Sequence, residues 1–164
     1  MAAHRPTGRL TAVGLCVVLV TLLVVAGVLG TRVRRYQAEE SRRQEILAAA
    51  RQTVVNFTTL DYRHGQTDLQ RVLQGATGDF ERELSGGLGQ LRELITENRA
   101  VSRGEVLEAG LASHDSDSAR VLVVADSTVS NRSSPTGQRR HYRIQLDLRR
   151  EGARWLVSDL EFVS

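Results

Sequence analysis

The chain has 164 residues, and its 22 basic side chains are all arginines, set against 19 acidic side chains. Residues 1–45 carry seven arginines and three acids, whereas residues 46–164 carry 15 arginines and 16 acids. This near-neutral C-terminal part lacks the basic footprint of a nucleic-acid-binding domain, so no nucleic-acid partner is expected. The single cysteine, Cys16, excludes an intramolecular disulfide, and the folded part must therefore be stabilised by burial of its own side chains.

Residues 10–29 contain no charged side chain and no Asn, Gln, His or Pro. A helix of this length rises about 30 Å, which matches the hydrocarbon core of a bilayer. We therefore predict a cytoplasmic tail at residues 1–9 and a transmembrane helix at residues 10–31. A buried core helix or a cleaved signal peptide would normally have a shorter apolar run. A lipoprotein anchor at Cys16 would need a small residue where Leu15 stands.

A charged segment, residues 32–45, follows the predicted span without Gly or Pro and predicts a helical stalk. Glu39 and Arg43 are four residues apart with the acid first, the favourable order on a helix. The stalk also holds more arginines than the tail does, so the positive-inside rule taken alone favours a cytoplasmic C-terminal domain.

Three helices are predicted after the stalk. Residues 46–61 repeat apolar side chains at helical spacing, and Gly65 can end that helix. Residues 67–73 begin with Thr67-Asp68-Leu69-Gln70, which has the form of a capping box. Thr77 can cap a third helix that starts near Asp79 and carries an apolar stripe: Leu84, Leu88, Leu91, Leu94 and Ile95.

The pattern changes to strands near residue 100. Four strands are predicted, separated by a polar turn at residues 113–118, a loop at residues 131–137 and a turn at residues 150–152. Their ranges are residues 101–111, 120–129, 142–149 and 155–163. The apolar run 121–125 fits a strand buried on both faces, whereas Tyr142, Ile144, Leu146 and Leu148 alternate with polar residues.

Helices followed by a meander of strands predict an α+β fold. We expect residues 46–164 to form one cone-like domain, with about three helices packed on a four-stranded curved antiparallel sheet. Such a cone often encloses a pocket. The sequence leaves open whether that pocket holds a lipid.

No residue pattern indicates catalysis, a cofactor or a metal ion. The Asp61-Tyr62 pair fits an acid/base pair at a pocket mouth, but it fits a structural hydrogen bond better. Asp115 and Asp117 lack the spacing of a helix–loop–helix calcium site and indicate a solvated turn. The histidines show no ligand spacing and are expected at the surface: His4, His64, His114 and His141.

Three short motifs occur in a characteristic order along the chain. They are Thr58-Thr59-Leu60-Asp61-Tyr62, Ala76-Thr77-Gly78-Asp79-Phe80 and Trp155-Leu156-Val157-Ser158-Asp159-Leu160. With the span and the stalk, they make residues 10–164 resemble the Mce-associated membrane proteins of mycobacteria and related actinobacteria. The family usually has a Tyr-like residue where Leu60 stands. The resemblance marks these positions as structural motif residues: Thr59, Asp61, Tyr62, Thr77, Asp79, Phe80, Trp155 and Asp159.

The resemblance implies the cone fold of nuclear transport factor 2 and ketosteroid isomerase. It also implies a non-enzymatic accessory subunit of an Mce lipid importer for fatty acids or sterols. Mce subunits or a permease and the lipid bilayer would be its partners. The soluble domain would lie on the extracytoplasmic side, against the arginine count. Two alternatives stay open: a ketosteroid-isomerase-like enzyme using Asp61, Asp79 or Asp147, and an assembly subunit of a type IV secretion or conjugation channel.

Overall fold

The computed structural model describes the backbone of residues 7–163 and the side chains of residues 29, 31, 32, 34 and 36–163. The chain divides into two compact units, residues 1–42 and 43–164. The predicted tail, and nearly all side chains of the predicted membrane helix at residues 10–31, lie outside the described residues. Among the residues that are described, none form a helix long and apolar enough to cross a bilayer.

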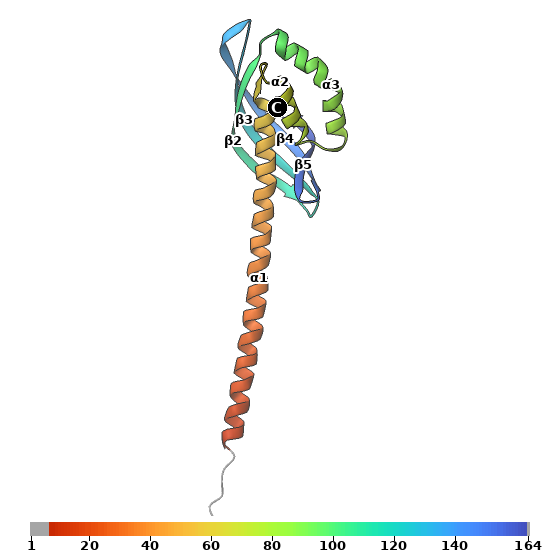
Figure 1. Ribbon diagram of the computed structural model, residues 1–164. Coiled ribbons are helices and arrows are strands. Elements are labelled where there is room, and N and C mark those ends of the chain that lie inside the picture. Colours follow the sequence, from red (N-terminus) through yellow and green to blue (C-terminus); the bar gives the residue numbers. More distant parts are fainter. Residues whose placement is uncertain (1–6, 164) are drawn as a thin grey trace, which may run out of the picture. The chain divides into compact units, whose positions relative to one another are not determined.

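The second unit is an α+β fold built on one antiparallel sheet (Figure 1). The sheet has five strands in the order β1-β2-β3-β4-β5, so each strand pairs with its neighbour in the sequence. This meander confirms the predicted fold class. The elements of the whole chain are α1 (Thr7–Thr58), β1 (Leu60–Asp61), α2 (Gly65–Leu73), α3 (Gly78–Glu97), β2 (Val101–His114), β3 (Ser118–Asn131), β4 (Ser134–Glu151) and β5 (Arg154–Phe162).

The fifth strand, β1, corrects the predicted count of four. Leu60 pairs with Ser102 and Asp61 pairs with Val101, so these two residues are strand rather than the end of the first helix. The main-chain N–H of Asp61 donates to the carboxylate of Asp68 at 2.9 Å. This long-range bond replaces the helical one that a continuing α1 would have made, and α1 ends at Thr58.

Two local predictions are also wrong. Helix α2 begins at Gly65, and His64 at its N-cap makes no side-chain hydrogen bond, so the capping box does not form. The predicted loop at residues 131–137 is shorter, because the Asn131 side chain accepts from the main-chain N–H groups of Ser133 and Ser134. That turn lets β4 start at Ser134.

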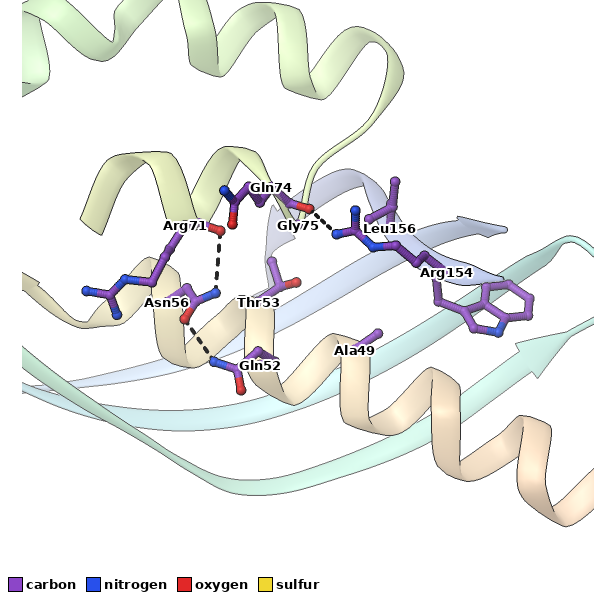
Figure 2. A pocket seen from close by; sticks show the side chains of 10 residues that line it. Ala49, Gln52, Thr53, Asn56, Arg71, Gln74, Gly75, Arg154 and Leu156 are labelled. Atoms are coloured by element: carbon purple, nitrogen blue, oxygen red, sulfur yellow. Dashed lines mark hydrogen bonds between the residues drawn. The ribbon is translucent and has the colours of Figure 1, made fainter. Parts of the chain in front are cut away.

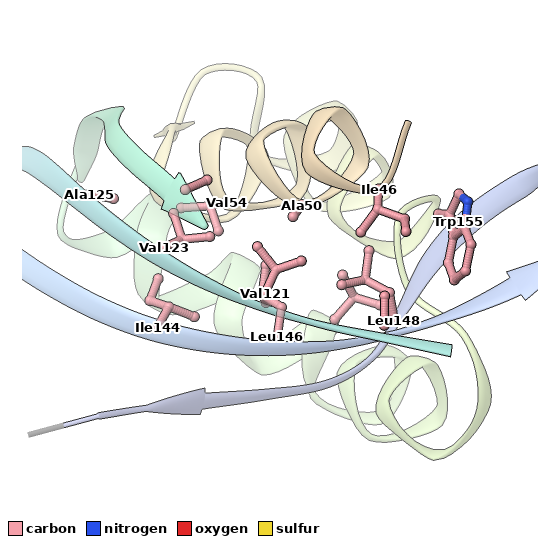
Figure 3. Close-up of a cluster of buried hydrophobic side chains, with 13 residues drawn as sticks. Ile46, Ala50, Val54, Val121, Val123, Ala125, Ile144, Leu146, Leu148 and Trp155 are labelled. Atoms are coloured by element: carbon pink, nitrogen blue, oxygen red, sulfur yellow. The ribbon is translucent and has the colours of Figure 1, made fainter. Parts of the chain in front are cut away.

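The core lies between α1 and the inner face of the sheet (Figure 3). Ile46, Ala50 and Val54 of α1 are fully buried, as their spacing predicted. They pack against alternate side chains of the long strands, which point to one face because a strand has a period of two. The strand residues are Ala109, Ala119, Val121, Val123, Ala125, Ile144, Leu146, Leu148, Trp155 and Val157.

The apolar stripe of α3 is buried only in part. Ile95 is buried and Phe80 packs against the core, but Leu91 and Leu94 are exposed. The run 121–125 is likewise not buried on both faces: Leu122 and Val124 point away from the core and stay accessible. Within the described residues, α1 covers only the opposite face of β3.

Candidate functional site

An open groove lies between α1, the C-terminal end of α2 and the start of β5 (Figure 2). Its volume is about 510 Å³. Six of its ten lining residues carry polar or charged side chains, in contrast to the hydrophobic core on the inner face of the sheet. The lining residues are Ala49, Gln52, Thr53, Asn56, Arg71, Gln74, Gly75, Arg154, Trp155 and Leu156.

The base of the groove is formed where Gly75 lies against the Thr53 side chain. Gly75 follows α2, and a Cβ atom at this position would lie 2.9 Å from the Thr53 hydroxyl oxygen of α1. The segment after α2 is also tied to β5, because the Val157 N–H donates to Gly75 O (2.8 Å) and the Thr77 N–H donates to Val157 O (2.9 Å). Glycine at position 75 therefore leaves room for the Thr53 side chain, while main-chain hydrogen bonds join the same segment to β5.

Hydrogen bonds hold the polar walls in place. Arg154 Nη2 donates to the main-chain oxygen of Gln74 at 2.6 Å. Asn56 Nδ2 reaches the main-chain oxygen of Arg71 at 3.5 Å, and Gln52 Nε2 donates to Asn56 Oδ1 at 2.9 Å. The carbonyl groups at the C-terminal end of α2 thus receive donors from β5 and α1, which orients the groove side chains.

The groove carries positive charge and an excess of donors. Arg71 and Arg154 line it, and no acidic side chain does. Arg71 also pairs with Asp68, outside the lining. Trp155 is 5% exposed, and its Nε1–H is buried without a hydrogen-bond partner in the described part of the chain. Such a site favours ligands that accept hydrogen bonds, such as carboxylates or peptide carbonyls.

Asp61 and Tyr62 lie outside this groove. Asp61 pairs with Arg63, and the hydrogen bonds from the Arg63 side chain and main-chain N–H lower the pKa of the Asp61 carboxyl to about 2. Tyr62 is half-buried, and its main-chain N–H donates to Ala100 O. Asp61 is therefore ionised at neutral pH and engaged in the turn before α2, which is the structural role rather than the acid/base one.

Thr59, Thr77 and Asp159 of the motifs make structural hydrogen bonds. Thr59 Oγ1 accepts from the main-chain N–H of Gly104 at 3.2 Å. Thr77 occupies the N-cap position of α3 with an extended backbone, but its hydroxyl contacts the Glu151 carboxylate instead of capping the helix. Asp159 accepts from the main-chain N–H of Leu160.

The candidate carboxylates do not converge. Asp61 lies on β1, Asp79 lies in the first turn of α3 beside Arg82, and Asp147 lies on β4, where Arg120 donates two hydrogen bonds to it. These bonds lower the pKa of the Asp147 carboxyl. Among the described residues, no group of His, Cys, Asp and Glu side chains has the arrangement of a metal site.

Several residues make contacts between elements that the sequence did not predict. Asp68 is buried and joins α2 to β1, although its sequence context indicated only a helix start. His141 lies at the surface as expected, but sequence patterns gave no sign that its Nδ1 would lie 2.6 Å from the Asp126 carboxylate on the neighbouring strand. Arg154 precedes the motif residue Trp155, and nothing in the sequence indicated that its side chain would donate to the main-chain oxygen of Gln74.

Comparison with solved structures identifies the fold. An IcmL-like type IV secretion system protein from Legionella pneumophila superposes with a TM-score of 0.61 and 16% identity, over 74% of this chain and 91% of that one. The periplasmic domain of DotI gives 0.58 and 14%, over 72% and 92%. A ketosteroid isomerase-like protein from Erwinia carotovora gives 0.52 and 17%, over 74% and 96%. The cone fold implied by the sequence motifs is thereby confirmed.

Comparison of sequences identifies the family. The chain is 27% identical over 158 residues to "Uncharacterized protein Rv1363c" of Mycobacterium tuberculosis, strain ATCC 25618 / H37Rv. The alignment covers 94% of the chain but only 60% of that relative's length. The sequence profile described as "Uncharacterized protein Rv1363c/MT1408-like" matches residues 9–164. The chain therefore belongs to the Rv1363c/MT1408-like family.

Proposed function

We propose that this chain is a non-enzymatic accessory subunit that helps to assemble a multi-protein complex in an actinobacterial cell envelope. The preferred complex is an Mce-type lipid importer, which the motif order of the sequence favours. The mycobacterial relative supports the actinobacterial setting.

The filled interior of the cone is the observation that carries this proposal. The inner face of the sheet is covered by α1, whose Ile46, Ala50 and Val54 are fully buried against it. The strand side chains of this core are aliphatic except for Trp155, and they form one buried cluster with α1 (Figure 3). A cone enzyme needs acid, base and oxyanion groups around a reacting atom. Here aliphatic carbon occupies that space, and the candidate carboxylates lie on three separate elements.

The groove supports the second part of the proposal, which is recognition of another protein. It is open to solvent, and its polar lining can bind an extended segment that offers carbonyl or carboxylate oxygens. Arg154 is held by Gln74 and is therefore oriented before a partner arrives. Preorganised donors lower the ordering cost of binding. We assign the groove to a partner segment with acidic residues or a free carboxyl terminus.

The proposal includes a membrane anchor and an extracytoplasmic domain. Residues 10–31 are the anchor, because of the length of the uncharged run. The arginines of the stalk argue for the opposite orientation. The fold shared with the periplasmic domain of DotI supports the extracytoplasmic one. A phosphatase reporter and a cytoplasmic fluorescent reporter, each fused to the C-terminus, test this directly. Phosphatase activity agrees with the proposal, and cytoplasmic fluorescence overturns it.

Affinity purification of the tagged full chain in mild detergent tests the function. We expect Mce subunits or their permease to co-purify with the wild type and to be lost with Arg154→Glu, which reverses the charge of the groove. Arg132→Glu is the matched control, because Arg132 is exposed in the β3–β4 turn, away from the groove. Recovery of no Mce subunit or permease overturns the proposal.

The same purification tests the second candidate, an assembly subunit of a type IV secretion or conjugation channel. The specific observation in its favour is the similarity of fold to the IcmL-like protein and to DotI. Conjugation ATPases or channel subunits in the eluate would favour it over the importer. The ketosteroid-isomerase-like alternative is favoured by fold similarity alone, at 17% identity.

A further inference from the structure

We propose that the outer face of the sheet, on the side away from α1, is a surface on which a second copy of this chain packs. Three aliphatic side chains lie exposed at its centre, and a sheet face normally carries polar residues where it meets water. Their exposed fractions are 51% for Leu107, 49% for Leu122 and 41% for Val124. This inference rests on a different face from the groove and does not depend on the proposed function.

A β-bulge gathers these side chains. The register between β2 and β3 shifts between Val106 and Glu108, so Leu107 is the extra residue beside Val124. Both residues of a bulge face one residue of the opposite strand, which places Leu107 and Val124 next to one another. Gly110 pairs with Leu122, and a Cβ atom at Gly110 would meet no atom within 4 Å. The surface therefore has an apolar ridge, and the space above Gly110 beside it is open.

Two rows of polar side chains border the apolar residues of β2 and β3 on opposite sides. Between the rows, β4 carries Arg143 and Gln145, the register partners of Val124 and Leu122. One row crosses the sheet through Glu105, Asp126 and His141, which are paired across β2, β3 and β4. The other row passes through Arg120 and Asp147, paired across β3 and β4. Within each row the charges are already engaged, since His141 contacts Asp126 and Arg120 donates to Asp147.

These rows are self-complementary about Val123. Consider a two-fold axis that passes over Val123, lies in the plane between the two sheets and runs perpendicular to the strands. This axis stacks Val124 on Leu122 of the second copy. It also places Asp126 opposite Arg120 of that copy. Ile144 is the register partner of Val123, so on β4 the same axis sets His141 against Asp147 of the second copy. A closed dimer requires this self-complementarity of one patch, and it is the argument for a second copy rather than another partner.

The same operation leaves one unfavourable pair. Arg139 and Arg149 are each five residues from Ile144 on β4. Each therefore faces the other residue of the second copy at the periphery of the interface, and this pair occurs twice. Exposed charges at a rim are screened by salt, so this pair weakens the dimer without preventing it. The small apolar centre and the charged rim predict a weak, reversible dimer.

Cysteine cross-linking of the full chain in detergent tests the axis. Cys16→Ser provides the background, and chains carrying Leu122→Cys are mixed with chains carrying Val124→Cys under mild oxidation. We expect disulfide-linked dimers that combine the two variants. Leu91→Cys mixed with Leu94→Cys is the control pair, since both residues are exposed on α3. Equal cross-linking of test and control pairs overturns the proposal.

Sedimentation of the full chain measures the affinity. We expect Leu122→Asp to weaken the dimer by at least about tenfold, because each copy would bury a carboxylate against Val124 of the other. Leu94→Asp, which changes an equally exposed leucine on α3, leaves the affinity unchanged. A wild-type chain that stays monomeric, an unchanged dimer in Leu122→Asp, or a different protein bound to this face overturns the proposal.

Discussion

The two faces of strand β3 differ although their side chains are chemically alike. Val121, Val123 and Ala125 point to α1 and are at most 1% exposed, whereas Leu122 and Val124 point outwards and stay 49% and 41% exposed. The hydrophobic residues alternate with other hydrophobic residues, so the sequence of the strand does not distinguish the faces. What distinguishes them is the presence of a helix on one side. Burial is thus a property of the packing partner, and apolar character is only a condition for it.

Deletion of the same atoms on each face should have unequal effects. Leu146→Ala removes a fully buried side chain from the inner face, and we expect the free energy of unfolding to fall by about 2–5 kcal/mol. Leu122→Ala, on the outer face, should lower it by about 1 kcal/mol or less. Denaturant unfolding of the full chain in detergent, followed by fluorescence of its one tryptophan, Trp155, measures both.

Both variants should be compared at a protein concentration below the dissociation constant of the proposed dimer, so that association does not contribute to stability. Equal losses in the two variants would show that the outer face is also covered, and would contradict the distinction drawn between the faces.

Two glycines of β2 allow the same comparison between the inner and outer faces of the sheet. A Cβ atom at Gly104 would lie 1.9 Å from the Thr58 hydroxyl oxygen of α1, whereas one at Gly110 would meet no atom within 4 Å. Gly104→Ala must push α1 away from β2, and we expect a loss of about 1–3 kcal/mol. Gly110→Ala serves as the matched control and should stay within about 0.5 kcal/mol of the wild type. The same fluorescence-monitored unfolding applies, and a neutral Gly104→Ala would be inconsistent with this close approach.

The outer face also offers an ion pair with a small expected effect. Arg120 lowers the pKa of the Asp147 carboxyl by hydrogen bonding. The pair therefore stabilises the folded state above the unfolded-state pKa near 4, and this contribution disappears as the pH falls through the lowered folded-state pKa.

Because Asp147 and Arg120 are both partly exposed, solvent screening limits the pair to about 0.2–1 kcal/mol. Asp147→Asn should lower stability by this amount at pH 7 and by less near pH 3. Arg120→Gln should reproduce the result, since it breaks the same pair from the other side. A loss that is as large at pH 3 as at pH 7 would mean that the effect is not electrostatic.

The amino-acid pattern determined the local structure of this protein well. Apolar residues at helical spacing placed Ile46, Ala50 and Val54 on the buried side of α1, and the alternation of Ile144, Leu146 and Leu148 fixed the inner face of β4. The order of helices and strands determined the α+β meander. These features follow from backbone periodicity, which acts within a few residues and is visible in one segment at a time.

Only the tertiary structure decided the features that join distant segments. The end of α1 at Thr58 depends on Asp68, the groove depends on Arg154 reaching Gln74, and His141 meets Asp126 through strand register. The exposure of Leu122 and Val124 depends on which face of the sheet α1 covers. The residues joined by these hydrogen bonds are between 7 and 80 positions apart in the sequence. Their proximity follows from how the elements pack, which no single segment of the sequence encodes.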